Sequence, residues 1–119
     1  MTDARRSLGQ SGERLAVMHL EAKGYQIVAR NVRVSNTGEI DIVALDDDTL
    51  VFVEVRTRRG VGLAAESINP RKAARMLVHA ENYVDEEHEA RRVDLVVVDL
   101  DENGRLLGVD HIVNAVTAD

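Results

Sequence analysis

The sequence predicts a single α/β domain in which helices flank a mixed β-sheet, with the elements in the order αβββαββ. Two observations favour this fold class. A chain of 119 residues, of which 45% are hydrophobic, suits one compact domain with its own core. One helical segment separates two groups of β-branched, strand-like segments, and this order is typical of a sheet with helices packed on its faces.

A helix and a strand are expected at the start of the chain. Apolar residues recur at helical spacing from about 12 to 23, and Gly24 follows where a glycine often ends a helix. Residues 25–34 (YQIVARNVRV) are rich in β-branched residues and have no helical stripe, so they predict a strand. The polar residues 35–38 (SNTG) predict the turn that follows.

The next two segments predict a β-hairpin. Residues 38–45 (GEIDIVAL) and 50–58 (LVFVEVRTR) read as strands, and the aspartates between them favour a tight turn at Asp47 and Asp48. With that turn, both faces of the hairpin are apolar close to the turn. Strands of this kind are usually covered on both sides, so we expect the hairpin to be buried.

The second half of the chain is expected to supply one helix and two strands. Asn69 is a natural helix N-cap, and Pro70 suits the first helical position. The expected segments are a loop at 58–67, the helix at 68–84, a valine-rich strand at 91–100, a turn at 101–104 and a strand near 106–113.

Two acidic residues of the hairpin raise a question of charge. A two-residue turn places Asp41 directly opposite Glu54 on one face, with Cβ atoms about 4.5–5.5 Å apart. Opposed carboxylates repel each other, so a compensating group is expected. Mg²⁺ is one solution, because it commonly binds through one or two carboxylates, and a salt bridge from Arg56 is another. A plain cross-strand charge cluster, with Glu39 opposite Arg56, is the structural alternative.

Basic residues are concentrated in one stretch of an acidic chain. The formal net charge is −6, yet residues 56–75 contain only one acid, Glu66. The cations of this stretch are Arg56, Arg58, Arg59, Arg71, Lys72 and Arg75. A basic patch of this kind is compatible with a partner that carries phosphate, if the fold gathers the side chains on one face. Ordinary solvated charges are the alternative.

Other features exclude several classes of protein. Without cysteine there are no disulfides or thiolate metal sites, and the histidines at 19, 79, 88 and 111 lack ligand-like spacing. The N-terminal residues lack the apolar core of a signal peptide, and no segment approaches the roughly 18 apolar residues that span a membrane. We therefore expect a cytoplasmic protein without a membrane partner.

Several motifs resemble known families. GEID at residues 38–41 and Glu54-Val55-Arg56 resemble the split acidic motif of the PD-(D/E)xK, or restriction-endonuclease-like, superfamily. Over most of its length the chain resembles the bacterial YraN family more closely. The further motifs are Gly12-Glu13 with Ala16, FVEVRTR, Lys72 with Leu77, Ala80 and Tyr83, and Arg92-Val93-Asp94. The resemblance implies a restriction-endonuclease-like fold and one nuclease-like domain over 1–119, with about 1–8 and 116–119 flexible.

The resemblance also implies a site. Asp41 and Glu54 would be the metal-binding carboxylates, and Glu13 would be a further acid from the first helix, unless it only interacts with the dipole of a first helical turn. The nucleic-acid-binding candidates are Arg58, Arg59, Arg71, Lys72 and Arg75. The last three lie near the start of the second helix, where amide donors favour phosphate, although a solvated helix face is the alternative.

The implied activity is hydrolysis of DNA phosphodiesters with Mg²⁺ or Mn²⁺, on branched or damaged DNA by analogy with resolvases. Arg56 stands where the superfamily usually has lysine; it can clamp phosphate but stays protonated and cannot act as a general base. Ala73 stands where relatives often have glutamine. These departures keep open a second interpretation, a catalytically weak or inactive module that binds nucleic acid. A third is a protein that binds another protein. A homodimer would suit an enzyme that acts on two strands.

Overall fold

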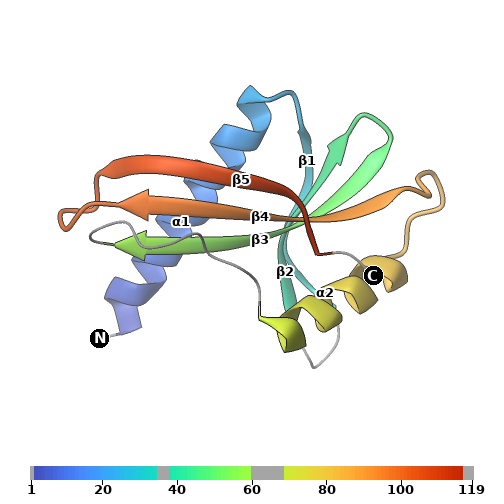
Figure 1. Cartoon of the computed structure of the whole chain (residues 1–119), viewed down its shortest axis with the longest axis horizontal. Helices are drawn as coiled ribbons and strands as arrows, with labels where there is room; N and C mark the ends of the chain where they lie inside the picture. Colours follow the sequence, from blue (N-terminus) through green and yellow to red (C-terminus); the bar gives the residue numbers. More distant parts are fainter. Residues whose placement is uncertain (1, 35–37, 60–68, 117–119) are drawn as a thin grey trace.

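The computed structural model describes residues 2–34, 38–59 and 69–116. It confirms the predicted order of a helix, three strands, a helix and two strands (Figure 1). The elements are α1 (Thr2–Ala22), β1 (Gln26–Arg33), β2 (Glu39–Asp46), β3 (Thr49–Arg59), α2 (Pro70–Asn82), β4 (Arg91–Leu100) and β5 (Leu106–Val116). Most of the turn expected at 35–38 and of the loop expected at 58–67 lies outside the described residues. The single-domain division and the flexibility of the two ends stay predictions.

Helix α1 differs most from its predicted bounds. It begins at Thr2, whereas the apolar spacing predicted a start near residue 12. The reason is that residues 2–11 are mostly polar and so give no apolar stripe from which a helix could be predicted. From residue 12 onward the helix packs closely, because a Cβ atom on Gly12 would lie 1.8 Å from Thr57 Oγ1 of β3.

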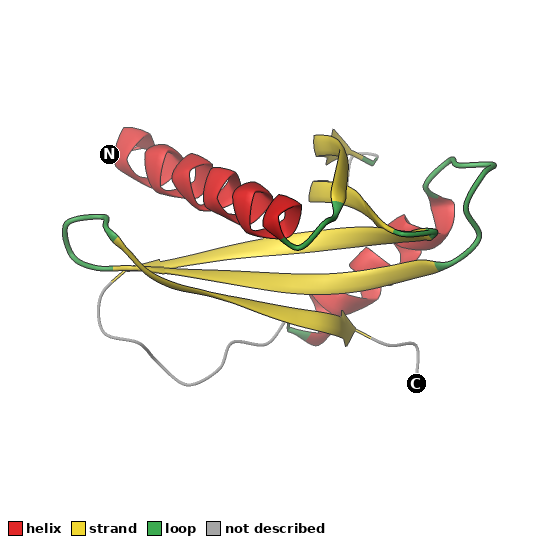
Figure 2. Ribbon diagram, turned by 90° about the horizontal axis from the view of Figure 1, so that it is seen from above, coloured by secondary structure: helices red, strands yellow, loops and turns green. Residues whose placement is uncertain are grey.

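The five strands form one mixed sheet in the order β1-β2-β3-β4-β5. Among the described strands, only β3 and β4 pair parallel, and α2 lies in the connection between them. The other neighbouring strands pair antiparallel. Figure 2 shows α1 and α2 on opposite faces of this sheet. Neither described helix has the length and hydrophobicity needed to cross a membrane.

Each helix covers its own core. The cluster under α1 contains Ala16, Leu20, Ile42, Ala44, Val51, Val53, Val96, Val98 and Leu100. The cluster under α2 contains Ile40, Val43, Leu50, Phe52, Met76, Ala80, Val93 and Val116. Burial of both hairpin faces is thus confirmed. Residues two apart in a strand normally share a face, but Ile40 packs under α2 whereas Ile42 packs under α1.

The hairpin register is confirmed near the turn. The pairs run from Asp46–Thr49 to Ile42–Val53, and Asp47 in the turn has a φ of 52°. The ladder ends there, one residue before Asp41 and Glu54. Beyond that point β2 continues beside β1, while β3 continues beside β4 as far as Arg59. The two acids therefore stand where β2 and β3 separate, which also explains the altered packing of Ile40.

Both ends of α2 are held by side chains. The Asn69 side-chain oxygen accepts a hydrogen bond from the backbone N of Lys72 at 2.9 Å, as the predicted N-cap requires. At the other end, Arg91 donates to the backbone oxygens of Ala80 and Tyr83 at 2.5 and 2.6 Å. These bonds anchor α2 on the sheet and fix the helix face that Lys72 presents to the strands.

Candidate active site

Asp41 and Glu54 meet at the point where β2 and β3 separate. Glu54 is only 4% exposed, although it carries a carboxylate in an apolar strand. Asp41 Oδ2 accepts a hydrogen bond from the backbone N of Val55 at 2.8 Å, so its side chain takes the place of a backbone partner in the ladder. The two side chains are also hydrogen-bonded to each other. The structure thus brings together the two predicted metal-binding acids.

Two cations approach Glu54. Lys72 of α2 forms an ion pair with Glu54 Oε2, and Arg56 Nε lies 3.8 Å from the same oxygen. The salt bridge expected from Arg56 is therefore present, but the closer partner is Lys72. The sequence predicted Lys72 only as a nucleic-acid-binding residue. Its contact with Glu54 makes it part of the acidic centre.

The proximity of the two acids changes the protonation of Asp41. Burial, together with the hydrogen bond to Glu54 and the negative charges of Glu54 and Glu13, raises the pKa of Asp41 to about 8. The hydrogen bond from Val55 N opposes this shift. At neutral pH the Asp41 side chain therefore keeps its proton, and the pair carries one negative charge in place of two.

Asp94 shows that burial alone does not produce this state. It is fully buried, but it accepts hydrogen bonds from His111 Nε2 at 2.7 Å, from Arg92 Nε at 2.9 Å and from the backbone N of Asn114 at 2.9 Å. Burial opposes ionisation, yet these donors hold the pKa of Asp94 below its usual range. Asp94 is a satisfied structural anion, whereas Asp41 has a second acid as its neighbour.

The Asp41–Glu54 pair fits a hard divalent cation. Across the described residues, no group of three or more His, Cys, Asp or Glu side chains is placed to hold a metal ion. Mg²⁺ commonly binds through only one or two carboxylates, with waters and substrate phosphate oxygens as its other ligands. The proton on Asp41 neutralises the carboxylate charge next to Glu54, and a bound cation would neutralise that charge in its place. The donor set therefore fits Mg²⁺ or Mn²⁺ with places left for water and phosphate.

Glu13 lies beside this pair without joining it. In the amide orientation that satisfies its neighbours, Asn31 donates to Glu13 Oε1 at 2.9 Å and to Glu39 Oε1 at 3.0 Å. Burial raises the pKa of Glu13, and its charge contributes to the raised pKa of Asp41. Because α1 begins at Thr2, Glu13 lies well inside the helix, and an interaction confined to a first helical turn is ruled out.

A pocket of about 220 Å³ opens beside the two acids. It is lined by Gly38, Glu39, Asp41, Lys72, Arg75, Met76 and His79. Residues 72, 75, 76 and 79 recur at helical spacing, so they form one stripe of α2 that faces the start of β2. The pocket thus has a wall of basic side chains on α2 and a wall of acids on β2.

The remaining predicted basic residues separate into two places. Arg58 pairs with Asp99 of β4 through hydrogen bonds of 2.7 and 3.1 Å. Arg59 lies at the far end of β3, where one of its guanidinium nitrogens would be 3.5 Å from a Cβ atom on Gly104. Arg71 is exposed at the start of α2. Figure 1 shows the end of β3 beside the β4–β5 turn and α2 on another part of the molecule.

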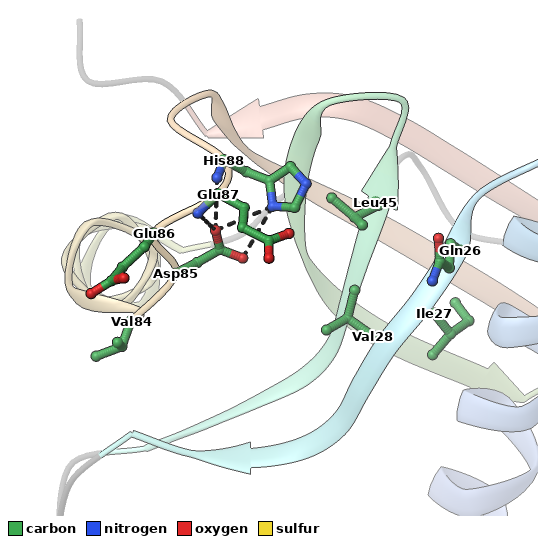
Figure 3. A pocket seen from close by; sticks show the side chains of 9 residues that line it. All are labelled: Gln26, Ile27, Val28, Leu45, Val84, Asp85, Glu86, Glu87 and His88. Atoms are coloured by element: carbon green, nitrogen blue, oxygen red, sulfur yellow. Dashed lines mark hydrogen bonds and ion pairs between the residues drawn. The ribbon is translucent and has the colours of Figure 1, made fainter.

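A larger hollow of about 590 Å³ lies between β1, β2 and the segment after α2 (Figure 3). One of its acids, Asp85, accepts hydrogen bonds from the backbone N of Glu87 at 2.8 Å and of His88 at 2.7 Å, and so shapes the local turn. None of the predicted site residues, all of which lie in the described part of the chain, lines this hollow. The candidate chemistry stays with the smaller pocket.

Sequence reasoning missed two features of the site. His79 lines the pocket although its spacing from the other histidines suggested no role, and Lys72 contacts Glu54 directly. The stripe at 72, 75, 76 and 79 was the available signal, because it mixes basic side chains with the apolar Met76 on one helix face. What it could not indicate was which strand that face would contact.

Comparison with known proteins finds similar chains in several bacteria. The model of Uncharacterised protein family UPF0102 matches residues 12–98, a range that contains every predicted site residue. A UPF0102 protein of Pelotomaculum thermopropionicum is 43% identical over 120 residues, which cover 97% of this chain and 99% of the relative. A UPF0102 protein of Dehalococcoides mccartyi is 47% identical over 103 residues, which cover 82% of this chain and 84% of the relative.

Proposed function

We propose a function for this chain as a member of Uncharacterised protein family UPF0102, to which it belongs and which is the YraN family that its motifs resemble. The proposed function is that of a metal-dependent nuclease that hydrolyses DNA phosphodiesters. One observation carries the proposal. Asp41 shares a hydrogen bond with the buried Glu54, and Asp41 also lines a pocket with basic side chains. Paired acids beside basic residues are suited to hold a cation and to bind a phosphate group between the two.

Asp41 and Glu54 would hold Mg²⁺ or Mn²⁺. When bound, such a cation lowers the pKa of a coordinated water and neutralises charge that develops on the phosphate. Asp41 must release its proton to bind the cation. The negative charge of Glu54 is balanced by its ion pair with Lys72. Glu13 adds negative charge near Asp41 and so favours a cation at this position.

Lys72 takes the role that a strand lysine has in the superfamily that the chain resembles. Its ammonium group is a compact donor that can bind a phosphate oxygen or orient a water next to Glu54. Arg56 approaches the same oxygen from β3 and can hold phosphate through its planar guanidinium group. Lys72, from α2, therefore replaces the amine that is missing at position 56.

Phosphodiesters of branched or damaged DNA are the substrates that we expect. The basic residues of the pocket lie beside the acids and can bind a backbone phosphate without reading a base. A homodimer would present one site to each strand of a duplex. A cytoplasmic location accords with a DNA substrate in bacteria.

The second candidate function is a nucleic-acid-binding module without efficient cleavage. The Lys72–Glu54 ion pair favours it, because this ammonium group already compensates the acid that a metal would need. Arg56 in place of lysine favours it as well. The two candidates make different predictions for Asp41, which the enzyme requires and the binding module does not.

Cleavage of a labelled branched DNA by the purified protein and its variants tests the proposal. Asp41→Asn and Glu54→Gln are expected to lower metal-dependent cleavage by at least about 100-fold, since each removes one of two metal ligands. Asp48→Asn, which removes an exposed carboxylate from the turn of the same hairpin, is the matched control and should cleave like the wild type. Cleavage retained by an Asp41→Asn/Glu54→Gln double variant would refute the nuclease, and DNA binding without any cleavage would favour the module.

A further inference from the structure

The pocket beside the acids has an inner end that the proposed metal site does not use. Its most buried lining residues are Met76, 7% exposed, and His79, 9% exposed. The outer part is formed by Lys72, whose side chain is 36% exposed, and by Arg75, which is exposed. A polar ring therefore lies at the inner end of a pocket whose entrance carries basic side chains.

His79 is placed to bind a ligand. Among the described residues it makes no hydrogen bond or ion pair, although nine-tenths of it is buried. No buried side-chain nitrogen or oxygen lacks a partner in the described structure, so the ring nitrogens of His79 remain accessible from the pocket. A neutral imidazole offers one N–H donor and an imidazolium offers two. Because these nitrogens are accessible and bind no described residue, they can serve a ligand that enters the pocket.

Gly38 lies close to the ring. A Cβ atom on Gly38 would lie 3.1 Å from His79 Cε1, which is closer than an ordinary van der Waals contact. Any larger residue at position 38 would therefore press on the imidazole and narrow this end of the pocket. Gly38 is also the first residue of the GEID motif, two positions before Ile40 and three before Asp41.

The size and charge of the pocket select a small anion. Its volume of about 220 Å³ is below the roughly 300–1,000 Å³ of pockets that hold drug-sized ligands, so a complete nucleotide exceeds it. Lys72, Arg75 and His79 supply donors on one side. On the other side the Glu39 carboxylate is held by the hydrogen bond that it accepts from Asn31. A phosphate group is the ligand that meets these conditions.

We propose that His79, opposite Gly38, forms a subsite for one backbone phosphate of the nucleic acid, next to the phosphate that the Asp41–Glu54 centre would cleave. The inference rests on the proposed function and names a further part of its substrate. A strand whose backbone enters the pocket must be bent or single there, because the inner end admits one phosphate group and not a duplex. The subsite would thus favour ends, nicks and branch points over continuous duplex.

Inorganic phosphate is the probe for a test in buffer with EDTA, where no metal-dependent cleavage contributes. The readout is the NMR spectrum of the histidine rings during a phosphate titration, which gives the dissociation constant and identifies the ring that responds. We expect the His79 signals to shift. His79→Leu should weaken phosphate binding roughly tenfold or more, because it removes a hydrogen bond to a charged group. His88→Leu, at a histidine outside the pocket, is the matched control and should bind like the wild type.

Gly38→Ala is an independent variant that keeps the imidazole but presses on it and narrows the pocket, so it should also weaken phosphate binding. It decides the question if His79→Leu does not fold. Phosphate affinity within twofold of the wild type in both folded variants, or an unchanged His79 spectrum, would overturn the subsite. If the protein cleaves DNA but these variants bind phosphate like the wild type, only the subsite proposal is refuted. If His79 binds phosphate but the protein does not cleave DNA, the nuclease proposal is refuted and the subsite proposal stands.

Discussion

The state of Asp41 is the residue-scale property on which the site depends. A carboxyl group that is buried beside another acid keeps its proton, because two negative charges at this distance are unfavourable. Asp94 is buried more completely and stays ionised, since it has donors on both oxygens. The difference lies in the neighbours and not in burial. Asp41 is thus a group whose charge changes when a cation or a proton occupies the centre.

Asp41 makes the stability of the protein depend on pH. Its pKa rises from 3.8 to about 8 on folding, so between these values the folded protein keeps a proton that the unfolded chain has lost. The free energy of unfolding therefore falls as the pH rises through this range. The stabilising contribution of Asp41 is completely lost once the pH has passed about 8.

The Asp41→Asn variant should remove this contribution. In urea unfolding with EDTA present, we expect the free energy of unfolding of the wild type to fall more between pH 5 and pH 8 than that of the variant. Parallel pH profiles for the two proteins would show that Asp41 ionises normally in the folded state. Asp48→Asn provides the control, because its carboxylate is exposed in the turn.

At the scale of elements, local chemistry predicted what depends on neighbours in sequence. Asn69 and Pro70 identified the start of α2 because N-cap and first-turn preferences act over three residues. The aspartates of the turn fixed the hairpin register down to Ile42–Val53. The separation of β2 from β3 before Asp41 was not predictable, since it results from pairing with β1 and β4 on either side.

The contact of α1 with β3 gives a prediction about packing. In Gly12→Ala the new methyl group would lie 1.8 Å from Thr57 Oγ1, so helix and strand must move apart. We expect a loss of about 1–3 kcal/mol in the free energy of unfolding, the usual cost of overpacking. Because α1 also carries Glu13 toward the acids, cleavage should fall in the same variant.

A Thr57→Ala exchange supplies the control for this prediction. It removes the hydroxyl that the new methyl group would meet, so the double variant should be less destabilised than the two single effects added together. Additive effects in thermal or urea unfolding would mean that Gly12 and Thr57 do not touch. Gly24→Ala is not a suitable comparison, because Gly24 has a φ of 93°.

At the scale of the whole molecule, the sheet determines which distant residues meet. The fold class and the burial of both hairpin faces followed from hydrophobic pattern, because a pattern with period two reports both faces of a strand. The hydrophobic pattern did not predict the contacts of Lys72 with Glu54 and of Arg58 with Asp99. Each joins residues from different elements, and only the tertiary arrangement sets such distances.

This arrangement changes the prediction for DNA binding. Because Arg75 lines the pocket on α2, whereas Arg58 and Arg59 lie at the end of β3, exchange of Arg71 and Arg75 for glutamine should weaken binding more than the same exchange at Arg58 and Arg59. The slope of log affinity against log salt concentration should fall by about one for each phosphate that the variant no longer neutralises. Fluorescence anisotropy at several salt concentrations measures both slopes. A larger effect at Arg58 and Arg59 would place the nucleic acid along the end of β3.

Proton release on metal binding tests the central claim, that Asp41 and Glu54 form a cation site in which Asp41 is protonated when no cation is bound. Calorimetric titration of Mn²⁺ or Mg²⁺ into the protein at pH 7, in two buffers with different ionisation enthalpies, gives the number of protons released. With the pKa of Asp41 at about 8, the account predicts saturable binding with release of close to one proton, and loss of both in Asp41→Asn. Binding without proton release, or equal affinity in the variant, would contradict it.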